Sequence, residues 1–194
     1  MKNFPKLYAE DIYEKVKEFV SELQGYDVPV DIEAIIESLD IEIIPVASLL
    51  SEHGIEATTN GRFNKIFIDY GRYLSDKHYR RARFSLAHEL GHILLHREFL
   101  DSNPYETLEE WLQILLKESD REYGILEFQA NIFAGAILVP EAQLLEAVAG
   151  GKKRIEIARL FEVSEDVIKR RIHNDKKVLE AVMRIIEDRE NPSS

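Results

Sequence analysis

The chain has 194 residues, of which 45% are hydrophobic and 31% are charged, as in one medium-sized domain or one domain with a small appendage. It contains no cysteine, so disulfides and thiolate metal sites are excluded, and a bound metal would need His, Glu or Asp ligands. A formal net charge of −11 at pH 7 argues against broad, nonspecific binding to DNA or to anionic membranes.

The first segments are predicted to form two helices and a strand. Apolar residues at helical spacing predict a helix over 9–23, and Gly25 would end it. Asp31 is placed to cap a short helix that ends at Leu39. The branched residues of Ile41–Val46 indicate a strand, so the chain mixes helix and strand from its beginning.

A β-hairpin is predicted next. Asn60-Gly61 separates two alternating runs, Ile55–Thr59 and Arg62–Tyr70, and this dipeptide between such runs favours a two-residue type I′ turn. We therefore expect a small antiparallel sheet. The strand near Arg62–Asp69 is a candidate edge strand that could align an extended substrate by β-addition.

The rest of the chain is predicted to be helical. Helical patterns cover the segments 108–119 (around Trp111), 122–138, 141–148, 155–161, 164–173 and 176–190. Pro140 closes the second of these helices, and Gly150-Gly151 forms a hinge. Strands early and helices afterwards indicate an α+β fold. We predict two units, residues 1–140 with the sheet and residues 141–194 as a C-terminal helical subdomain.

The candidate metal ligands lie in a helical segment that begins between Ser75 and Arg80 and contains a His-Glu-x-x-His run. Positions i and i+4 of a helix share a face, so the imidazoles of His88 and His92 can converge on one divalent ion. Glu89 would lie beside the ion, where it can accept a proton from the attacking water. The alternative is a solvated helix with two chance histidines. Mostly apolar neighbours argue against it, because two buried imidazoles without partners would be costly.

A third ligand must come from another segment, because a catalytic zinc usually has three protein ligands and one open position. Glu127 is the main candidate, and Glu118 and Glu122 are alternatives. On a helix Asn131 shares a face with Glu127 and is placed to hold a carboxylate or an imidazole proton. Glycine inside a helix costs about 1 kcal/mol relative to alanine, so Gly91 fits close contact between the two helices.

Three segments together resemble one known family. They are Arg83-Phe-Ser-Leu-Ala-His-Glu-Leu-Gly-His-Ile-Leu-Leu-His96, Glu127-x-x-Ala-Asn-x-Phe-Ala134 and Ile137-Leu-Val-Pro140, and they are similar to the motifs of the ImmA/IrrE family of metallopeptidases. The resemblance covers about residues 28–175. It implies a zincin-like, gluzincin-type domain with one Zn²⁺ per chain. It also implies that His88, His92 and Glu127 are the zinc ligands and that Glu89 is the catalytic base.

The resemblance implies a function as well. Members of the family act in the bacterial cytoplasm on repressors of phages or mobile elements and in stress responses, and they cleave a helix-turn-helix repressor or trigger its cleavage. We therefore expect a zinc-dependent endopeptidase whose partner is a DNA-binding repressor. The alternative is a metal-holding regulator that binds the repressor without hydrolysing it, but the intact Glu89 favours catalysis. No apolar run approaches twenty residues and no export signal is evident, so we expect a cytoplasmic protein without a membrane partner.

The connection between the two motifs is longer than in compact members of the family, and a helix around Trp111 is expected to restrict the cleft. His96 lies one helical turn after His92. A fourth protein ligand would leave no open position, so we predict that His96 makes a helix-end contact or supports a ligand from behind. The isolated histidines His53, His78 and His173 are expected to be ordinary surface residues.

The segment 155–172 resembles a helix-turn-helix in its pattern, with Ala158 as the small residue of the first helix. The range Lys152–Lys177 holds 9 basic and 5 acidic residues, which is the composition of a possible DNA reader. Glu165 and Asp166, however, lie where a recognition helix would meet phosphates. We therefore do not expect direct DNA binding and favour a scaffold or partner-docking role.

Overall fold

The computed structural model describes residues 7–23, 27–100 and 121–190. These residues are mainly helical with one small sheet, so the predicted α+β class is confirmed. The predicted helix around Trp111, with its expected effect on the cleft, lies outside the described residues.

Among the described residues, the N-terminal part contains four helices and three strands. In chain order they are α1 (Ala9–Glu22), α2 (Ile32–Ser38), β1 (Glu42–Val46), α3 (Leu49–His53), β2 (Ala57–Thr59), β3 (Lys65–Asp69) and α4 (Tyr70–Tyr73). Asp31 caps α2 as predicted, because its carboxylate accepts a hydrogen bond of 3.0 Å from the backbone N–H of Ala34. Helices α3 and α4, with five and four residues, were not predicted because they are too short to show helical periodicity.

The remaining described helices follow the predictions within a few residues. They are α5 (Tyr79–Leu100), α7 (Arg121–Leu138), α8 (Glu141–Ala149), α9 (Arg154–Leu160), α10 (Glu165–Asn174) and α11 (Lys176–Glu190). Pro140 is the N-cap of α8, and Gly151, with φ 76°, adopts the left-handed conformation between α8 and α9 that glycine tolerates best. Of the described helices, none alone is long and apolar enough to cross a membrane. The bent pair formed by 124–138 and Glu141–Ala149 has the length and composition of a membrane span only when the two helices are taken together.

The sheet differs from the prediction in two ways. Its strand order is β1-β3-β2, and β3 pairs in parallel with β1 and antiparallel with β2, so the sheet is mixed and not antiparallel. Strand β3 is central, so the segment Arg62–Asp69 is not an edge strand and cannot accept a substrate by β-addition. The hairpin pattern predicted the β2–β3 pair, but the parallel pairing of β1 with β3 joins strands that are separated by α3 and β2.

The connection between β2 and β3 is a five-residue loop, Asn60–Asn64, and not a type I′ turn. A type I′ turn requires positive φ at both central residues, whereas here Phe63 has a φ of 55° and Gly61 has no positive φ. The side-chain oxygen of Asn60 accepts hydrogen bonds of 3.1 Å from the backbone N–H groups of Asn64 and Lys65. Phe63 is only 2% exposed, so burial of this ring and the Asn60 contacts stabilise the longer loop.

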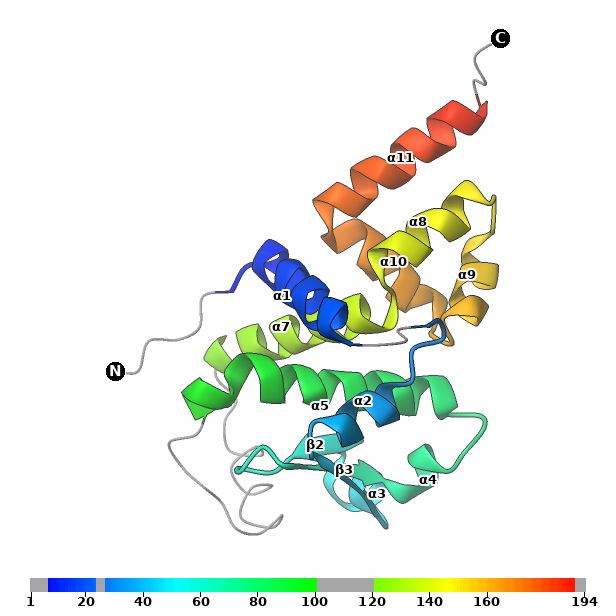
Figure 1. Cartoon of the computed structure of the whole chain (residues 1–194). Helices are drawn as coiled ribbons and strands as arrows, with labels where there is room; N and C mark the ends of the chain where they lie inside the picture. The colour runs from blue at the N-terminus through cyan, green and yellow to red at the C-terminus, as the bar shows by residue number, and fades with distance from the viewer. Residues whose placement is uncertain (1–6, 24–26, 101–120, 191–194) are drawn as a thin grey trace.

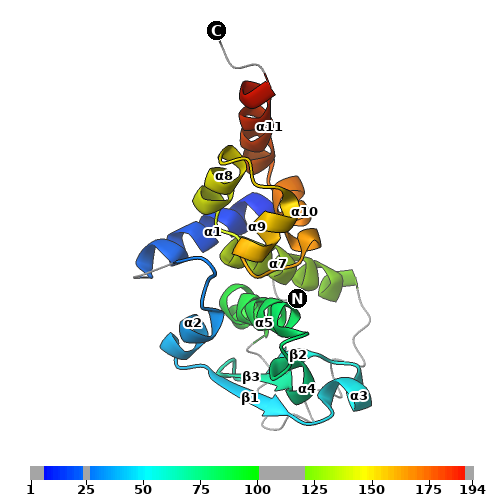
Figure 2. The same cartoon turned by 90° about the vertical axis from the view of Figure 1, so that its right-hand side faces the viewer.

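Helix α5 lies between the sheet and the other long helices, with α7 on its far side and the C-terminal helices beyond (Figures 1 and 2). One hydrophobic core runs through these layers. Its members include Ile12, Ile36, Ile66, Leu90, Phe133, Phe161, Ile168 and Val178. Residues on both sides of residue 140 thus share this core, and the predicted division into units 1–140 and 141–194 stays a prediction.

Candidate metal centre

Helices α5 and α7 lie side by side, and small residues permit their close contact (Figure 1). A Cβ atom added to Gly91 of α5 would lie 3.1 Å from Cβ of Phe133 and 3.2 Å from Cα of Ala130, both in α7. Ala130 and Ala134 are completely buried. The close helix contact predicted from Gly91 is therefore confirmed, and it brings polar side chains of the two helices within reach of one another.

Three of these side chains converge: His88 and His92 from α5 and Glu127 from α7. The two Nε2 atoms are 3.0 Å apart, Nε2 of His88 is 3.3 Å from Oε2 of Glu127, and Nε2 of His92 is 3.1 Å from Oε1. The structure thus brings together the three ligand candidates that the sequence favoured. Of the alternatives for the third ligand, Glu118 and the side chain of Glu122 lie outside the described part of the chain.

The spacing of these atoms fits a metal ion. Zinc binds nitrogen and carboxylate oxygen at about 2.0–2.1 Å, which puts the ligand atoms of a tetrahedral site about 3.3 Å apart. The separations of 3.0, 3.1 and 3.3 Å are close to that value. Two imidazole nitrogens only 3.0 Å apart also need a proton or a cation between their lone pairs. The group is therefore able to hold a metal ion.

Electrostatics in the site favour an ionised Glu127. Burial by itself raises the pKa of this carboxyl, but the neighbouring imidazoles of His88 and His92 hold the pKa well below its usual range. Burial also lowers the pKa of His88, but the hydrogen bond to Glu127 and the charge of Glu89 outweigh burial and raise this pKa. The carboxylates thus give the site the negative potential that a cation requires.

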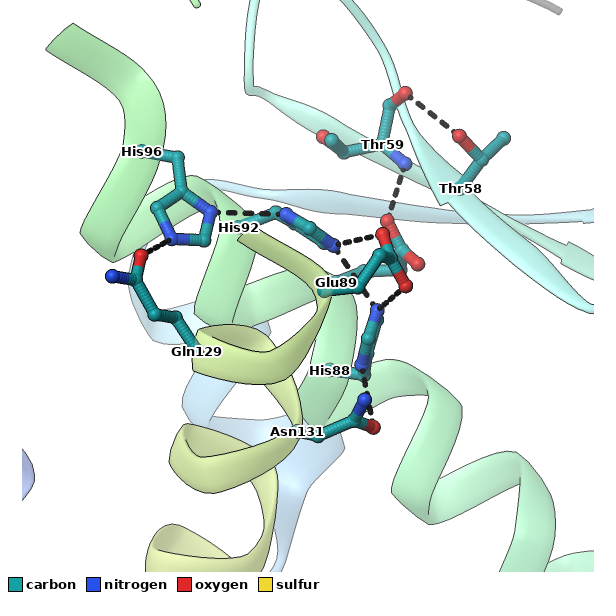
Figure 3. Close-up of polar contacts among 9 residues, drawn as sticks. Thr58, Thr59, His88, Glu89, His92, His96, Gln129 and Asn131 are labelled. Atoms are coloured by element: carbon teal, nitrogen blue, oxygen red, sulfur yellow. Dashed lines mark hydrogen bonds and ion pairs between the residues drawn. The ribbon is translucent and has the colours of Figure 1, made fainter. Parts of the chain in front are cut away.

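The Nδ1 atom of His92, on the other side of the ring from the converging Nε2, contacts other buried polar side chains (Figure 3). Its Nδ1 lies 3.0 Å from Nδ1 of His96, and Nε2 of His96 lies 2.9 Å from Oε1 of Gln129. His96 is completely buried, and burial, together with the neighbouring His92, lowers the pKa of His96 to about 3. His96 contacts a ligand candidate from behind, as predicted. Sequence reasoning missed Gln129, although Gln129 and Asn131 are the only polar side chains in the apolar stretch 128–139.

His88 is supported from the solvent side. Its Nδ1 lies 3.2 Å from the side-chain oxygen of Asn131, one turn after Glu127 in α7 (Figure 3). Asn131 is exposed, in contrast to the buried partners of His92. The contact with an imidazole is one of the two that helical spacing predicted for Asn131.

Glu89 lies beside the three converging residues and is not one of them. Its Oε2 accepts a hydrogen bond of 2.8 Å from the backbone N–H of Thr59 at the end of β2 (Figure 3). The next residue, Asn60, donates its N–H to Lys65, so the N–H of Thr59 points away from β3, as strand alternation requires. Sequence reasoning missed Thr59, because a backbone donor from a distant strand leaves no mark in the side-chain pattern.

Comparison with known families identifies the chain. The model of the IrrE N-terminal-like domain family, Peptidase_M78, matches residues 72–173, just over half of the 194 residues. The chain belongs to this family. The match includes all of α5 and all of α7, so it covers His88, Glu89, His92 and Glu127. Family membership and the three converging side chains together indicate a metallopeptidase. No curated protein matches the chain.

The other histidines of this family member lie away from the site. His53 and His173 are exposed, as expected for ordinary surface residues. His78 is half-buried, and its Nδ1 lies 2.6 Å from a guanidinium nitrogen of Arg72.

Proposed function

We propose that the protein is a zinc-dependent endopeptidase with a zincin-like, gluzincin-type domain. The observation that carries the proposal is the convergence of His88, His92 and Glu127, with the carboxylate of Glu89 held next to them. Two imidazoles and one carboxylate are the ligand set of a known class of catalytic zinc sites, and this set leaves one position open.

The residues of the site have different roles in the proposed hydrolysis. His88, His92 and Glu127 would hold the zinc. When bound, zinc acts as a Lewis acid toward the scissile carbonyl and makes the attacking water more acidic. Glu89 accepts the proton from that water and passes it to the leaving amine. The N–H of Thr59 holds one oxygen of Glu89 at 2.8 Å, which fixes the carboxylate against the end of β2.

The edge of β2 is our candidate for substrate alignment, in place of the central strand β3. Within the described part of the chain, strand β2 is at the edge of the sheet, and its last residue, Thr59, contacts Glu89. An extended peptide gains main-chain hydrogen bonds when it pairs with an edge strand, and here the pairing would place it beside the base.

We propose that the substrate is a helix-turn-helix repressor of a phage, mobile element or stress response in the cytoplasm of a bacterium. The family resemblance supports this proposal, and so does the net charge of −11, because an acidic body attracts a basic partner and accelerates encounter. A peptidase confined to one partner would also spare other cytoplasmic proteins.

We propose that α9 and α10 form a helix-turn-helix-like pair that serves as a scaffold or docking unit and does not bind DNA. Two basic side chains of the pair have acidic partners: Arg154 lies 2.9 Å from Glu165, and Arg170 lies 2.7 Å from Asp166. Such pairing reduces the charge available to phosphates. Salt-dependent binding of the purified protein to random duplex DNA would contradict this proposal.

Two measurements test the enzymatic proposal. Protein purified without added zinc should contain close to one zinc per chain, and only trace metal with no uptake on titration would contradict the proposal. The purified protein should cleave its repressor while leaving unfolded casein intact, and efficient casein digestion would contradict the single-partner claim. If Glu89→Gln relieves repression as well as the wild type does, the protein is instead a regulator that binds without hydrolysis.

A further inference from the structure

A chain of three polar contacts connects the N-terminal segment to His92. The side-chain N–H of Gln129 donates to the backbone carbonyl of Leu7 at 2.9 Å. Oε1 of Gln129 lies 2.9 Å from Nε2 of His96, and Nδ1 of His96 lies 3.0 Å from Nδ1 of His92 (Figure 3). Gln129 is 1% exposed and His96 is 0% exposed, so water does not compete for the two contacts of His96.

The carbonyl of Leu7 fixes the first proton of the chain. A backbone carbonyl can only accept a hydrogen bond, so the amide nitrogen of Gln129 must face Leu7 and the amide oxygen must face His96. An amide oxygen can only accept as well. Nε2 of His96 therefore carries a proton and donates it to Gln129.

Burial fixes the second proton. If Nδ1 of His96 also carried a proton, the ring would be a cation, and none of the described carboxylates pairs directly with this completely buried side chain. An unpaired buried charge is strongly unfavourable, so Nδ1 of His96 accepts. The proton between the two Nδ1 atoms then belongs to His92, and Nε2 of a neutral His92 presents a bare lone pair to the metal site.

We propose that Gln129 is a positioning residue that, acting through His96, fixes His92 in the single tautomer able to bind a metal, before any metal is present. The inference rests on the metal site of the proposed function, but it does not depend on hydrolysis. Leu7 lies outside the residues 72–173 that the family model matches, so this chain supplies the anchor from its own N-terminal segment. Gln129 acts through another side chain and does not itself touch the metal.

The first test is the tautomer of His92 in the metal-free wild-type protein. Two-bond ¹H–¹⁵N correlation spectra at alkaline pH distinguish protonated from unprotonated ring nitrogens. We expect a proton on Nδ1 of His92 and on Nε2 of His96, with the other two nitrogens bare. A proton on Nε2 of His92 under these conditions overturns the proposal, and no variant has to fold for this result to be decisive.

The second test removes the acceptor. Gln129→Met keeps the length of the side chain but provides no oxygen for His96, so the two histidines are free to exchange tautomers. We expect a mixture of His92 tautomers and a Zn²⁺ affinity that is about 10–100-fold weaker, measured by competition with a chromophoric chelator. The control is Leu126→Met, a volume-conserving change at another buried position of α7, which should leave both readouts unchanged.

The outcomes separate this inference from the proposed function. An unchanged His92 tautomer and a Zn²⁺ affinity within about twofold of the wild type in Gln129→Met would overturn the role of Gln129. If the wild type binds no Zn²⁺, the proposed enzyme fails, while the tautomer measured without metal still decides the hydrogen-bond chain. If it binds Zn²⁺ but does not cleave its partner, the chelator competition still tests Gln129.

Discussion

The metal-site helices, α5 and α7, and the C-terminal helices, α8 to α11, both bury polar side chains but use them differently. In the C-terminal region, Arg171 and Asp175 form a salt bridge of 2.7 Å at 4% and 6% side-chain exposure. The guanidinium also donates to the carbonyl of Val139 at 3.1 Å, and Asp175 accepts from the N–H of Val178 at 3.2 Å. Arg171 and Asp175 thus both have their hydrogen-bond partners within the protein, which is the arrangement of a structural ion pair.

In the metal-site region, buried and half-buried polar side chains instead direct their lone pairs toward one point. His88, His92 and Glu127 face each other across 3.0 to 3.3 Å, and their outer atoms are held by Asn131 and His96. Lone pairs that converge at this spacing are unfavourable unless a proton or a cation lies between them. Burial of charge alone therefore does not indicate a functional site, whereas the convergence of several lone pairs on one point does.

The largest expected effect is on catalysis. Glu89→Gln keeps the size of the side chain and the contact with Thr59 but removes the base, so the rate of repressor cleavage should fall by about 10²–10⁴-fold. Zinc content should not change, because Glu89 is not among the three converging residues. Glu52→Gln, at an exposed position of α3, is the matched control. Cleavage by Glu89→Gln at a rate within a few-fold of the wild type would remove Glu89 from the mechanism.

The second prediction concerns the C-terminal ion pair. Asp175→Ala leaves Arg171 buried without its carboxylate, so the free energy of unfolding should fall by about 3–5 kcal/mol. Zinc affinity of the folded protein should stay the same, because the pair serves packing. Asp166→Ala removes an ion pair of the same i,i+4 spacing and the same 2.7 Å, but one that is exposed, and should cost about 1 kcal/mol or less. Urea unfolding measures both, and equal losses would contradict the distinction.

The third prediction tests the close contact of α5 with α7. Gly91→Ala places a methyl group 3.1 Å from Phe133, so Phe133 and the α7 backbone at Ala130 must shift by a few tenths of an ångström. We expect a loss of about 1–3 kcal/mol in stability despite the helix propensity of alanine. Zinc affinity should also weaken, because Glu127 moves with α7. In Gly135→Ala the new Cβ meets no atom within 4 Å, so this control should be neutral or stabilising. A Gly91→Ala protein as stable as the wild type would show that the contact can adjust.

The smallest effect is expected at Asn131. Asn131→Ala removes the partner of Nδ1 of His88, but water can replace an exposed side chain there, so Zn²⁺ affinity should fall by about tenfold or less. The loss should be smaller than in Gln129→Met, where water cannot enter. Chelator competition on both variants measures the difference. A larger loss of Zn²⁺ affinity in Asn131→Ala than in Gln129→Met would contradict the expectation that the buried contact matters more than the exposed one.

Much of the local structure could be predicted because its causes are local. The capped start of α2, the start of α5, the limits of α7 and the i,i+4 placement of His88 and His92 follow from contacts within one or two helical turns. Spacing on a second helix indicated that Glu127 and Asn131 share a face. These parts of the fold and the site agree with the sequence because neighbouring residues alone determine them.

The tertiary structure decided what depends on contacts between distant segments. The parallel pairing of β1 with β3 made β3 central and left β2 at the edge, so the strand expected to bind substrate was the wrong one. The backbone N–H of Thr59 reached Glu89, and the carbonyl of Leu7 reached Gln129, at sequence separations of 30 and 122 residues. Backbone donors and acceptors are the same in every residue except proline, so the sequence determined the ligand-bearing helices, but only folding determined which backbone groups orient the base and the buried support of His92.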